Sequence, residues 1–225
     1  MRVSVVVTVY KMKNWQELTK RNIESILIQS FRDFEIVVSD DSDDNEIREW
    51  LNQYGDKIKY YKNPGEKGMP NNTNHGMDMA KGELTKILYQ DDYFYDERSL
   101  WDIVRHFTAW TQWMITPCVH TENGIDFFNE HRPYYSESEN TLGSPSLLTL
   151  RSEIKERFDP RFSWVLDLDF YKRLFRKYGK PKYLDKVNVV MGFHQGQMTY
   201  LLSDERKQEE FNLMKNRIRS RRKYD

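Results

Sequence analysis

Two pairs of adjacent aspartates are the side chains in this sequence best suited to chemistry. Asp40 and Asp41 follow the apolar run FEIVVS, and Asp91 and Asp92 follow LTKILYQ. Adjacent carboxylates repel each other, and one reading of such a pair is a polar turn that caps a following helix. The other reading is that a positive group lies against them, such as a hard divalent cation that shares its shell with phosphate oxygens. The choice depends on where the surrounding elements place the two pairs.

Apolar patterning predicts that both pairs end parallel strands. Residues 3–10, VSVVVTVY, form a nearly unbroken β-branched run, which is typical of a strand buried on both faces. A helix that begins near Asn14, with Glu17 three residues later as in a capping box, separates this run from the strand at 34–39. Strand, helix and strand over this length indicate a βαβ unit and hence an α/β fold.

The remaining elements follow the same reasoning. We expect helices over 47–54, 71–80, 166–178 and 203–223, and strands over 58–62, 84–90, 112–117, 127–135, 144–150 and 187–193. The first half alternates strands and helices regularly, whereas the second half has shorter and less regular strands. The chain has no long-period repeat.

Composition limits the function classes. A chain of 225 residues is long enough for one sizeable domain with a C-terminal appendage. Lys and Arg total 35, as do Asp and Glu, so no net field points to a nucleic-acid partner. Cys118 is the single cysteine, which excludes disulfides within the chain. No apolar run resembles a signal peptide or a membrane span, and we expect a soluble, cytoplasmic protein.

Ligands of open α/β sheets bind beyond the carboxyl ends of the strands. There the first strand ends at Thr8, Val9 and Tyr10, near both acidic pairs. The segment TVYKMKNW has no glycine-rich phosphate loop, so neither a Walker motif nor a dinucleotide fingerprint is present. A cation would then neutralise bound phosphates, and Asp91 and Asp92 would be tolerated together beside it.

Three segments, VSVVVTVYK, SILIQSFRDFEIVVSDDSDD and NHGMDMAKGELTKILYQDD, occur here in the order and at the spacing found at the start of family 2 glycosyltransferases. The chain resembles this family over residues 3 to about 100. Further on, SPSLLTLRSEI and WVLDLDFYKRL resemble its acceptor-side segment and its catalytic-base motif. The resemblance implies a GT-A fold, with a Rossmann-like, mostly parallel sheet flanked by helices and a smaller, mixed acceptor-side region.

The resemblance also implies a domain organisation and a donor site. Residues 1–202 would form a single domain, with a nucleotide-sugar-binding half at 1–100 and an acceptor half at 101–202, followed by a basic C-terminal helix or tail at 203–225. The donor-binding residues by this resemblance are Thr8, Val9, Tyr10, Asp41, Asn74 and Asp91. Asp92 becomes the principal ligand of Mn²⁺ or Mg²⁺, and His194 is either a third ligand or a structural residue.

In WVLDLDF, the base position of the family falls on Asp167, although Asp169 stands close by. The two are about 200° apart on a helix, so one of them at most is catalytic. The sequence departs from the family pattern at Ser42, Thr73 and Leu166. The implied reaction moves a sugar from a nucleotide diphosphate, with UDP-sugar as the expected donor, to an acceptor hydroxyl with inversion. A retaining transferase and a non-catalytic nucleotide-sugar-binding protein are the alternatives.

The C-terminal segment KNRIRSRRK concentrates positive charge at Lys215, Arg217, Arg219, Arg221, Arg222 and Lys223. It is either a solvated face or a contact with an anionic membrane surface or acceptor. The expected partners are therefore a nucleotide-diphospho-sugar donor and a glycan or lipid-linked acceptor, with no nucleic acid and with possible peripheral membrane contact.

Overall fold

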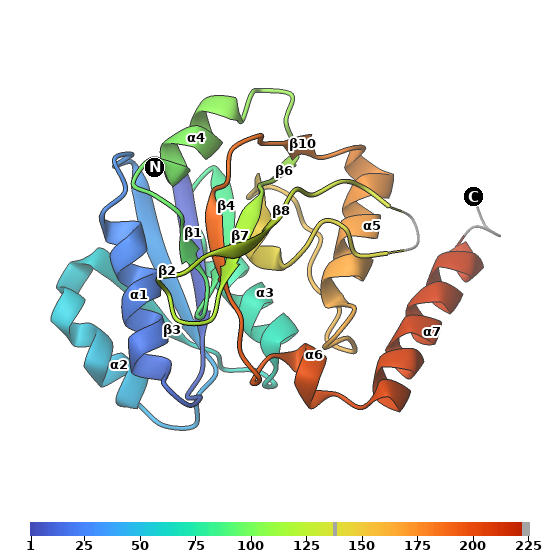
Figure 1. The fold of residues 1–225 in the computed structure, drawn as a ribbon, viewed down its shortest axis with the longest axis horizontal. Coiled ribbons are helices and arrows are strands. Elements are labelled where there is room, and N and C mark those ends of the chain that lie inside the picture. Colours follow the sequence, from blue (N-terminus) through green and yellow to red (C-terminus); the bar gives the residue numbers. More distant parts are fainter. Residues whose placement is uncertain (137–138, 222–225) are drawn as a thin grey trace.

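A seven-stranded sheet forms the centre of the computed structural model, which describes residues 1–136 and 139–221, with side chains up to residue 217 (Figure 1). Its strands are β1 (Val3–Val9), β2 (Phe34–Asp40), β3 (Ile58–Lys62), β4 (Leu84–Tyr89), β6 (Trp113–Ile115), β9 (Leu148–Arg151) and β10 (Lys182–Tyr183). They lie in the order β10-β6-β9-β4-β1-β2-β3. All neighbours pair in parallel except β9, which is antiparallel to β4 and β6. The expected mostly parallel sheet is confirmed.

Helices flank this sheet on both sides (Figure 1). They are α1 (Trp15–Leu27), α2 (Glu46–Leu51), α3 (Met69–Met79), α4 (Ser99–His106), α5 (Leu166–Tyr178), α6 (Met198–Leu201) and α7 (Asp204–Arg221), with short 3₁₀ turns η1 (Asn52–Lys57) and η2 (Pro145–Leu147). Helix α3 packs on β1 and β2. A Cβ atom at Gly76 would lie 2.5 Å from Cγ1 of Val6, so the glycine of the NHG segment permits this close approach.

A second, four-stranded sheet covers part of the acceptor half. Its strands are β5 (Tyr93–Phe94), β7 (Cys118–Thr121), β8 (Phe128–His131) and β11 (Val189–Gly192), in the order β5-β11-β7-β8. Pairing of β11 with β5 brings the late segment after residue 189 next to the chain that follows β4. This sheet therefore carries His194 to the donor side of the molecule.

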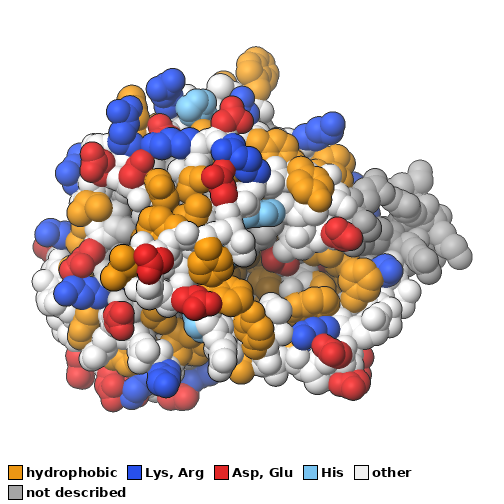
Figure 2. Space-filling view, viewed as in Figure 1, with side chains coloured by type: hydrophobic (Ala, Val, Ile, Leu, Met, Phe, Trp, Pro, Cys, Tyr) orange, Lys and Arg blue, Asp and Glu red, His pale blue; other side chains and the backbone are white. Residues whose placement is uncertain are grey.

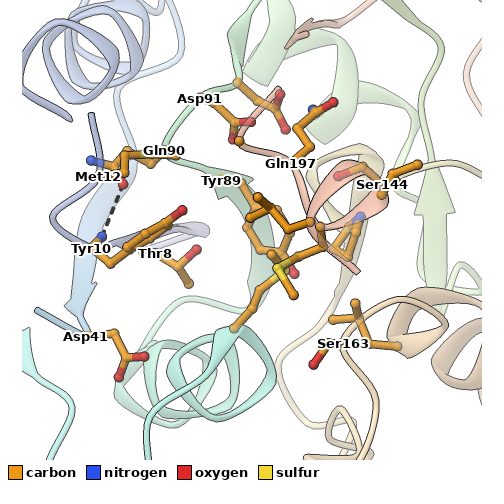
Figure 3. A pocket seen from close by; sticks show the side chains of 18 of the residues that line it. Thr8, Tyr10, Met12, Asp41, Tyr89, Gln90, Asp91, Ser144, Ser163 and Gln197 are labelled. Atoms are coloured by element: carbon orange, nitrogen blue, oxygen red, sulfur yellow. Dashed lines mark hydrogen bonds between the residues drawn. The ribbon is translucent and has the colours of Figure 1, made fainter. Parts of the chain in front are cut away.

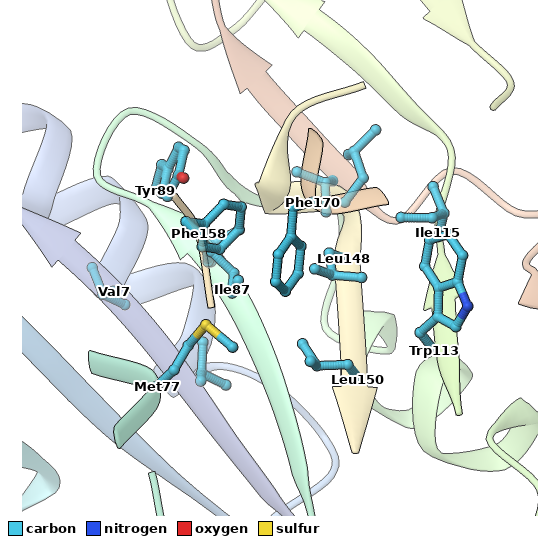
Figure 4. Packing of buried hydrophobic residues seen from close by; sticks show 14 of the residues in the cluster. Val7, Met77, Ile87, Tyr89, Trp113, Ile115, Leu148, Leu150, Phe158 and Phe170 are labelled. Carbon is cyan, nitrogen blue, oxygen red and sulfur yellow. The ribbon is translucent and has the colours of Figure 1, made fainter. Parts of the chain in front are cut away.

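The core extends from the parallel strands to α5 (Figure 4). All residues of β1 are buried, as the β-branched run predicts. Phe158 and Phe170 stack with ring centroids 4.2 Å apart, and neither is more than 1% exposed. Burial of each such ring contributes about 1.5–3 kcal/mol, so α5 is held firmly against the sheet.

Helix α7 also packs against the domain, although its sequence indicates an appendage. Met214 is fully buried and the side chain of Glu210 is 1% exposed. Of the basic segment, Arg219 and Arg221 have side chains outside the described part, and Arg222 and Lys223 lie outside the described residues altogether. Within the described ranges, none of the helices combines the length and apolar character needed to cross a bilayer.

Several local expectations differ from the structure. Asn14 precedes α1 in a left-handed conformation with φ 62° and makes no side-chain cap, so the capping-box interpretation is wrong. The strand expected at 144–150 begins as the turn η2. The strands β5, β7 and β10 and the helices α4 and α6 were not expected, since each is short, with eight residues or fewer.

Candidate functional site

A cavity of about 860 Å³ opens beyond the carboxyl ends of β1, β2 and β4. Figure 3 shows Thr8, Tyr10, Asp41 and Asp91 around this space. The predicted site residues that line the cavity are Thr8, Tyr10, Asp41, Asp91, Asp92, Asp167 and His194. Residues from both halves of the chain therefore meet at one site.

The first acidic pair divides its roles because successive side chains of a strand point to opposite faces. Asp40 is fully buried and accepts hydrogen bonds from Tyr60 Oη at 2.6 Å and Lys62 Nζ at 3.1 Å. Asp41 lines the cavity, and its two oxygens accept from Asn63 Nδ2 and Gly68 N, each at 2.7 Å. The carboxylate expected to receive the nucleotide base is thus held in place by protein donors.

The second pair lies in the turn between β4 and β5, and its outward member is Asp91. Its Oδ2 lies 3.1 Å from Nε2 of His194, which follows β11. The N–H of Gly196 donates to the other imidazole nitrogen, Nδ1, at 3.1 Å, so Nε2 faces the carboxylate. The hydrogen bond to Asp91 raises the pKa of His194.

Asp92 turns inward and is 2% exposed. Its Oδ1 accepts the N–H of Gly192 at 3.0 Å. Glycine is needed at this position, because a Cβ atom would lie 2.5 Å from the backbone oxygen of Asp91. Burial, followed by the neighbouring charge of Asp91, raises the pKa of Asp92 well above its usual value. Hydrogen bonds from Ser146 and Gly192 and the positive charge of the buried Lys86 oppose this rise without cancelling it.

These three side chains fit a hard cation in their chemistry. Asp91 and Asp92 carry carboxylate oxygens and His194 carries an imidazole nitrogen, which are ligand types that such cations accept. Among the described residues, no three His, Cys, Asp or Glu side chains form a ready-made metal cluster.

The end of β1 forms the neighbouring wall. Thr8 is 8% exposed and Tyr10 is 44% exposed, and both line the cavity. The backbone N–H of Tyr10 donates to Oε1 of Gln90 at 3.1 Å, while Nε2 of Gln90 donates to Thr19 at 2.7 Å. Gln90 therefore fixes the end of β1 beside the acids of β4. It was not predicted as a site residue, although it directly precedes Asp91 in the sequence.

Two predicted donor residues lie elsewhere. Val9 is fully buried and does not line the cavity; its backbone oxygen accepts the N–H of Asp41 at 2.9 Å. Asn74 is also absent from the cavity wall. Its side chain exchanges two hydrogen bonds of 2.8 Å with the backbone of Phe158. Neither residue lines the cavity, and both are instead held by hydrogen bonds within the protein.

Asp167 and Asp169 occupy different environments, as their helical spacing requires. Asp167 is half-buried in the cavity wall, where Oδ2 accepts from Asn140 Nδ2 at 2.7 Å. Burial raises the pKa of Asp167 to about 7. Asp169 is 2% exposed, does not line the cavity, and pairs with Arg173 at 2.8 Å and Arg217 at 3.3 Å. Asp167 is therefore the member of the pair that can reach a ligand.

Comparison with known families identifies the chain. The family described as "Glycosyl transferase family 2" matches residues 4–179. The chain belongs to glycosyl transferase family 2.

Two curated relatives of this family 2 chain match less than half of its length. A GalNAc(5)-diNAcBac-PP-undecaprenol beta-1,3-glucosyltransferase of Campylobacter jejuni is 42% identical over 95 residues, which cover 40% of this chain and 30% of that protein. An uncharacterized glycosyltransferase of Rickettsia typhi is 33% identical over 97 residues, which cover 43% of this chain and 29% of that protein. The matched stretches therefore span less than a third of either relative.

Solved structures show the same fold. S. aureus TarS 1-349 in complex with UDP-GlcNAc superposes with a TM-score of 0.73 at 19% identity, covering 90% of this family 2 chain and 62% of the TarS 1-349 chain. The mannosyltransferase PcManGT from Pyrobaculum calidifontis, in complex with GDP-Man and Mn²⁺, gives a TM-score of 0.62 at 18% identity, covering 88% and 58%. The family 2 chain thus has the GT-A fold expected from its motifs.

Proposed function

We propose that this family 2 chain is a metal-dependent glycosyltransferase that moves a sugar from a nucleotide diphosphate to an acceptor hydroxyl with inversion, in glycan or polysaccharide synthesis. The observation that carries the proposal is a single cavity lined by Asp91 and His194 from the donor side and by Asp167 from α5. A carboxyl group with its pKa raised to about 7 at this place suits a general base, a role that a binding protein does not need. UDP-sugar is the proposed donor, in keeping with the UDP-GlcNAc bound to TarS.

In this proposal the nucleotide lies along the ends of β1 and β2. Thr8 and Tyr10 contact the base and ribose, and Asp41 accepts a hydrogen bond from the base. Asp92 and His194 would hold Mn²⁺ or Mg²⁺ together with the diphosphate, and Asp91, which lies 3.1 Å from His194, would contact the ribose or the sugar. When bound, such a cation supplies Lewis-acid stabilisation of the negative charge that develops on the leaving diphosphate.

Asp167 acts on the acceptor. Its carboxylate accepts the proton of the attacking hydroxyl as the new bond to the anomeric carbon forms. The bond between that carbon and the diphosphate breaks, and its electron pair leaves with the diphosphate. Attack from the face opposite the leaving group inverts the anomeric centre. The Campylobacter jejuni relative acts on an undecaprenol-linked glycan, and we propose a glycan or lipid-linked acceptor here as well.

The test is a panel of nucleotide sugars that includes UDP-GlcNAc and GDP-Man, assayed with Mn²⁺ and with a chelator. We expect release of the nucleoside diphosphate from one donor class, dependent on metal, and an inverted product by NMR. Donor binding without any turnover would instead support a nucleotide-sugar-binding protein. A product with the donor's own anomeric configuration would indicate a retaining transferase and would remove the role of Asp167.

A further inference from the structure

A buried carboxylate of α7 lies against the segment that leads into α5. Glu210 is 1% exposed, and its oxygens accept the backbone N–H groups of Ser163 at 3.0 Å, Trp164 at 2.8 Å and Val165 at 3.3 Å. The side chain of Arg206, one turn earlier on α7, lies 3.5 Å away. One carboxylate therefore binds three successive backbone donors that are 45 or more residues away in sequence.

These three donors directly precede α5 and end at its N-cap residue, Val165. Val165 has no side chain able to cap, and no side-chain cap is made there. Glu210 therefore holds the chain that enters α5, up to and including the N-cap amide, from a different helix. Its negative charge is favourable at the positive end of α5.

The same segment forms part of the cavity wall. Ser163 and Trp164 line the cavity, and Asp167 is the second residue of α5. Glu210 thus holds the backbone two residues before Asp167, while the Asp167 carboxylate itself accepts from Asn140 and from the N–H of Leu168. A second tie supports this arrangement, since Arg217 of α7 lies 3.3 Å from Asp169 on the same helix.

We infer that Glu210 is a positioning residue for Asp167, through which α7 fixes the first turn of α5 at the cavity wall. The inference rests on the proposed function, in which Asp167 accepts the proton. The inference makes α7 part of the glycosyltransferase domain and gives it a role in the reaction, whereas the sequence indicates a basic appendage after residue 202.

The test compares Glu210→Gln with Glu209→Gln. Glu209 directly precedes Glu210 on α7. Its side chain is 70% exposed and makes a loose contact of 3.5 Å with Arg206, so it is a matched control. The readout is release of UDP from UDP-GlcNAc in the presence of Mn²⁺. We expect Glu210→Gln to lower kcat on the order of 10²-fold with the donor KM unchanged, since a misplacement of about 1 Å costs that much. The Glu209 variant should match the wild type.

A double-mutant cycle with Asp167→Asn separates positioning from a general structural effect. In the Asp167→Asn background, Glu210→Gln should cost nothing further, because the group it positions is already gone. Equal losses in both backgrounds would overturn the inference. The Asp167→Asn variant by itself tests the proposed function. A fully active Asp167→Asn enzyme would refute the role of Asp167 as the base, but not the contact that Glu210 makes with residues 163–165.

Hydrogen exchange at residues 163–165 gives a measurement that needs no donor. Glu210→Gln should lose protection of these amides, and Glu209→Gln should keep it. Unchanged protection would contradict the inference even if UDP-GlcNAc is not turned over. Should Glu210→Gln fold poorly, Glu210→Asp keeps the charge on a shorter side chain and should recover part of both the protection and the kcat; no recovery would count against the inference.

Discussion

Nε2 of His194 lies 3.1 Å from Oδ2 of Asp91, although 103 positions separate the two residues in the sequence. Pairing of β11 with β5 creates this contact, because it places the chain after Gly192 beside the turn that follows β4. A carboxylate and an imidazole thus face the cavity from opposite halves of the chain. Both halves therefore contribute to one proposed cation and diphosphate site.

Stabilisation by UDP should depend on a divalent cation. No glycine-rich loop follows β1, and in the proposed function a metal held beside Asp91, by Asp92 and His194, neutralises the diphosphate. With Mn²⁺ and UDP at a hundred times its dissociation constant, we expect about 2.7 kcal/mol of added stability by thermal or chemical unfolding. Asp91→Asn and His194→Ala should each reduce this increment while leaving the ligand-free unfolding transition nearly unchanged. An equal increment in chelator would refute the metal site.

Asp167→Asn should lower transfer roughly 10²- to 10⁴-fold with little change in donor affinity, because it removes a proton acceptor and keeps the shape. Asp169→Asn should instead destabilise the fold by about 1–3 kcal/mol, since it breaks buried charge-assisted hydrogen bonds to Arg173 and Arg217. Steady-state kinetics and urea unfolding of both variants distinguish these effects. Loss of transfer in the Asp169 variant alone would show that the base is assigned to the wrong residue.

Ionisation of Asp167 should make the rate of transfer rise with pH and the stability of the fold decrease with pH. Burial raises its pKa from 3.8 to about 7. The ionised form accepts the proton, so kcat should rise with pH through about 7. The folded state keeps its proton between these two pKa values whereas the unfolded chain releases it, so this group's contribution to stability is present below pH 3.8 and is lost as pH rises through about 7. Asp167→Asn should abolish both trends, as measured by pH–rate profiles and by unfolding at several pH values.

The predicted peripheral contact with anionic membranes should not depend on Arg217. This side chain is 23% exposed and pairs with Asp159 at 2.5 Å as well as with Asp169. Removing residues 218–225 should therefore weaken flotation with phosphatidylserine vesicles and mimic the effect of salt, which screens charges over about 10 Å at 0.1 M. Arg217→Gln should leave flotation unchanged and lower the unfolding temperature. If flotation is insensitive to both salt and truncation, the basic C-terminal segment is a solvated face and not a membrane contact.

The sequence by itself determined the parallel half of the fold and the place of the donor acids. The β-branched run of β1 and the ordered motifs up to residue 92 encode local structure, and a strand buried on both faces has a recognisable composition. Because parallel strands end at one edge of the sheet, Asp41 and Asp91 were expected to meet there, and both line the cavity.

The tertiary structure decided the roles within each group of similar residues. The contact with Lys62 of β3 buries Asp40 and leaves Asp41 at the cavity, and the contact with Gly192 turns Asp92 inward. Helical periodicity does not distinguish Asp167 from Asp169, whereas the ion pairs with Arg173 and Arg217 bury Asp169. The hydrogen bonds of Asn74 with Phe158 keep its side chain out of the cavity wall, and contacts with residues 163–165 give Glu210 its inferred role. Apart from the pair of Asp169 with Arg173, which is four residues away, these contacts join residues at least 22 positions apart, and such pairs leave no local pattern in the sequence.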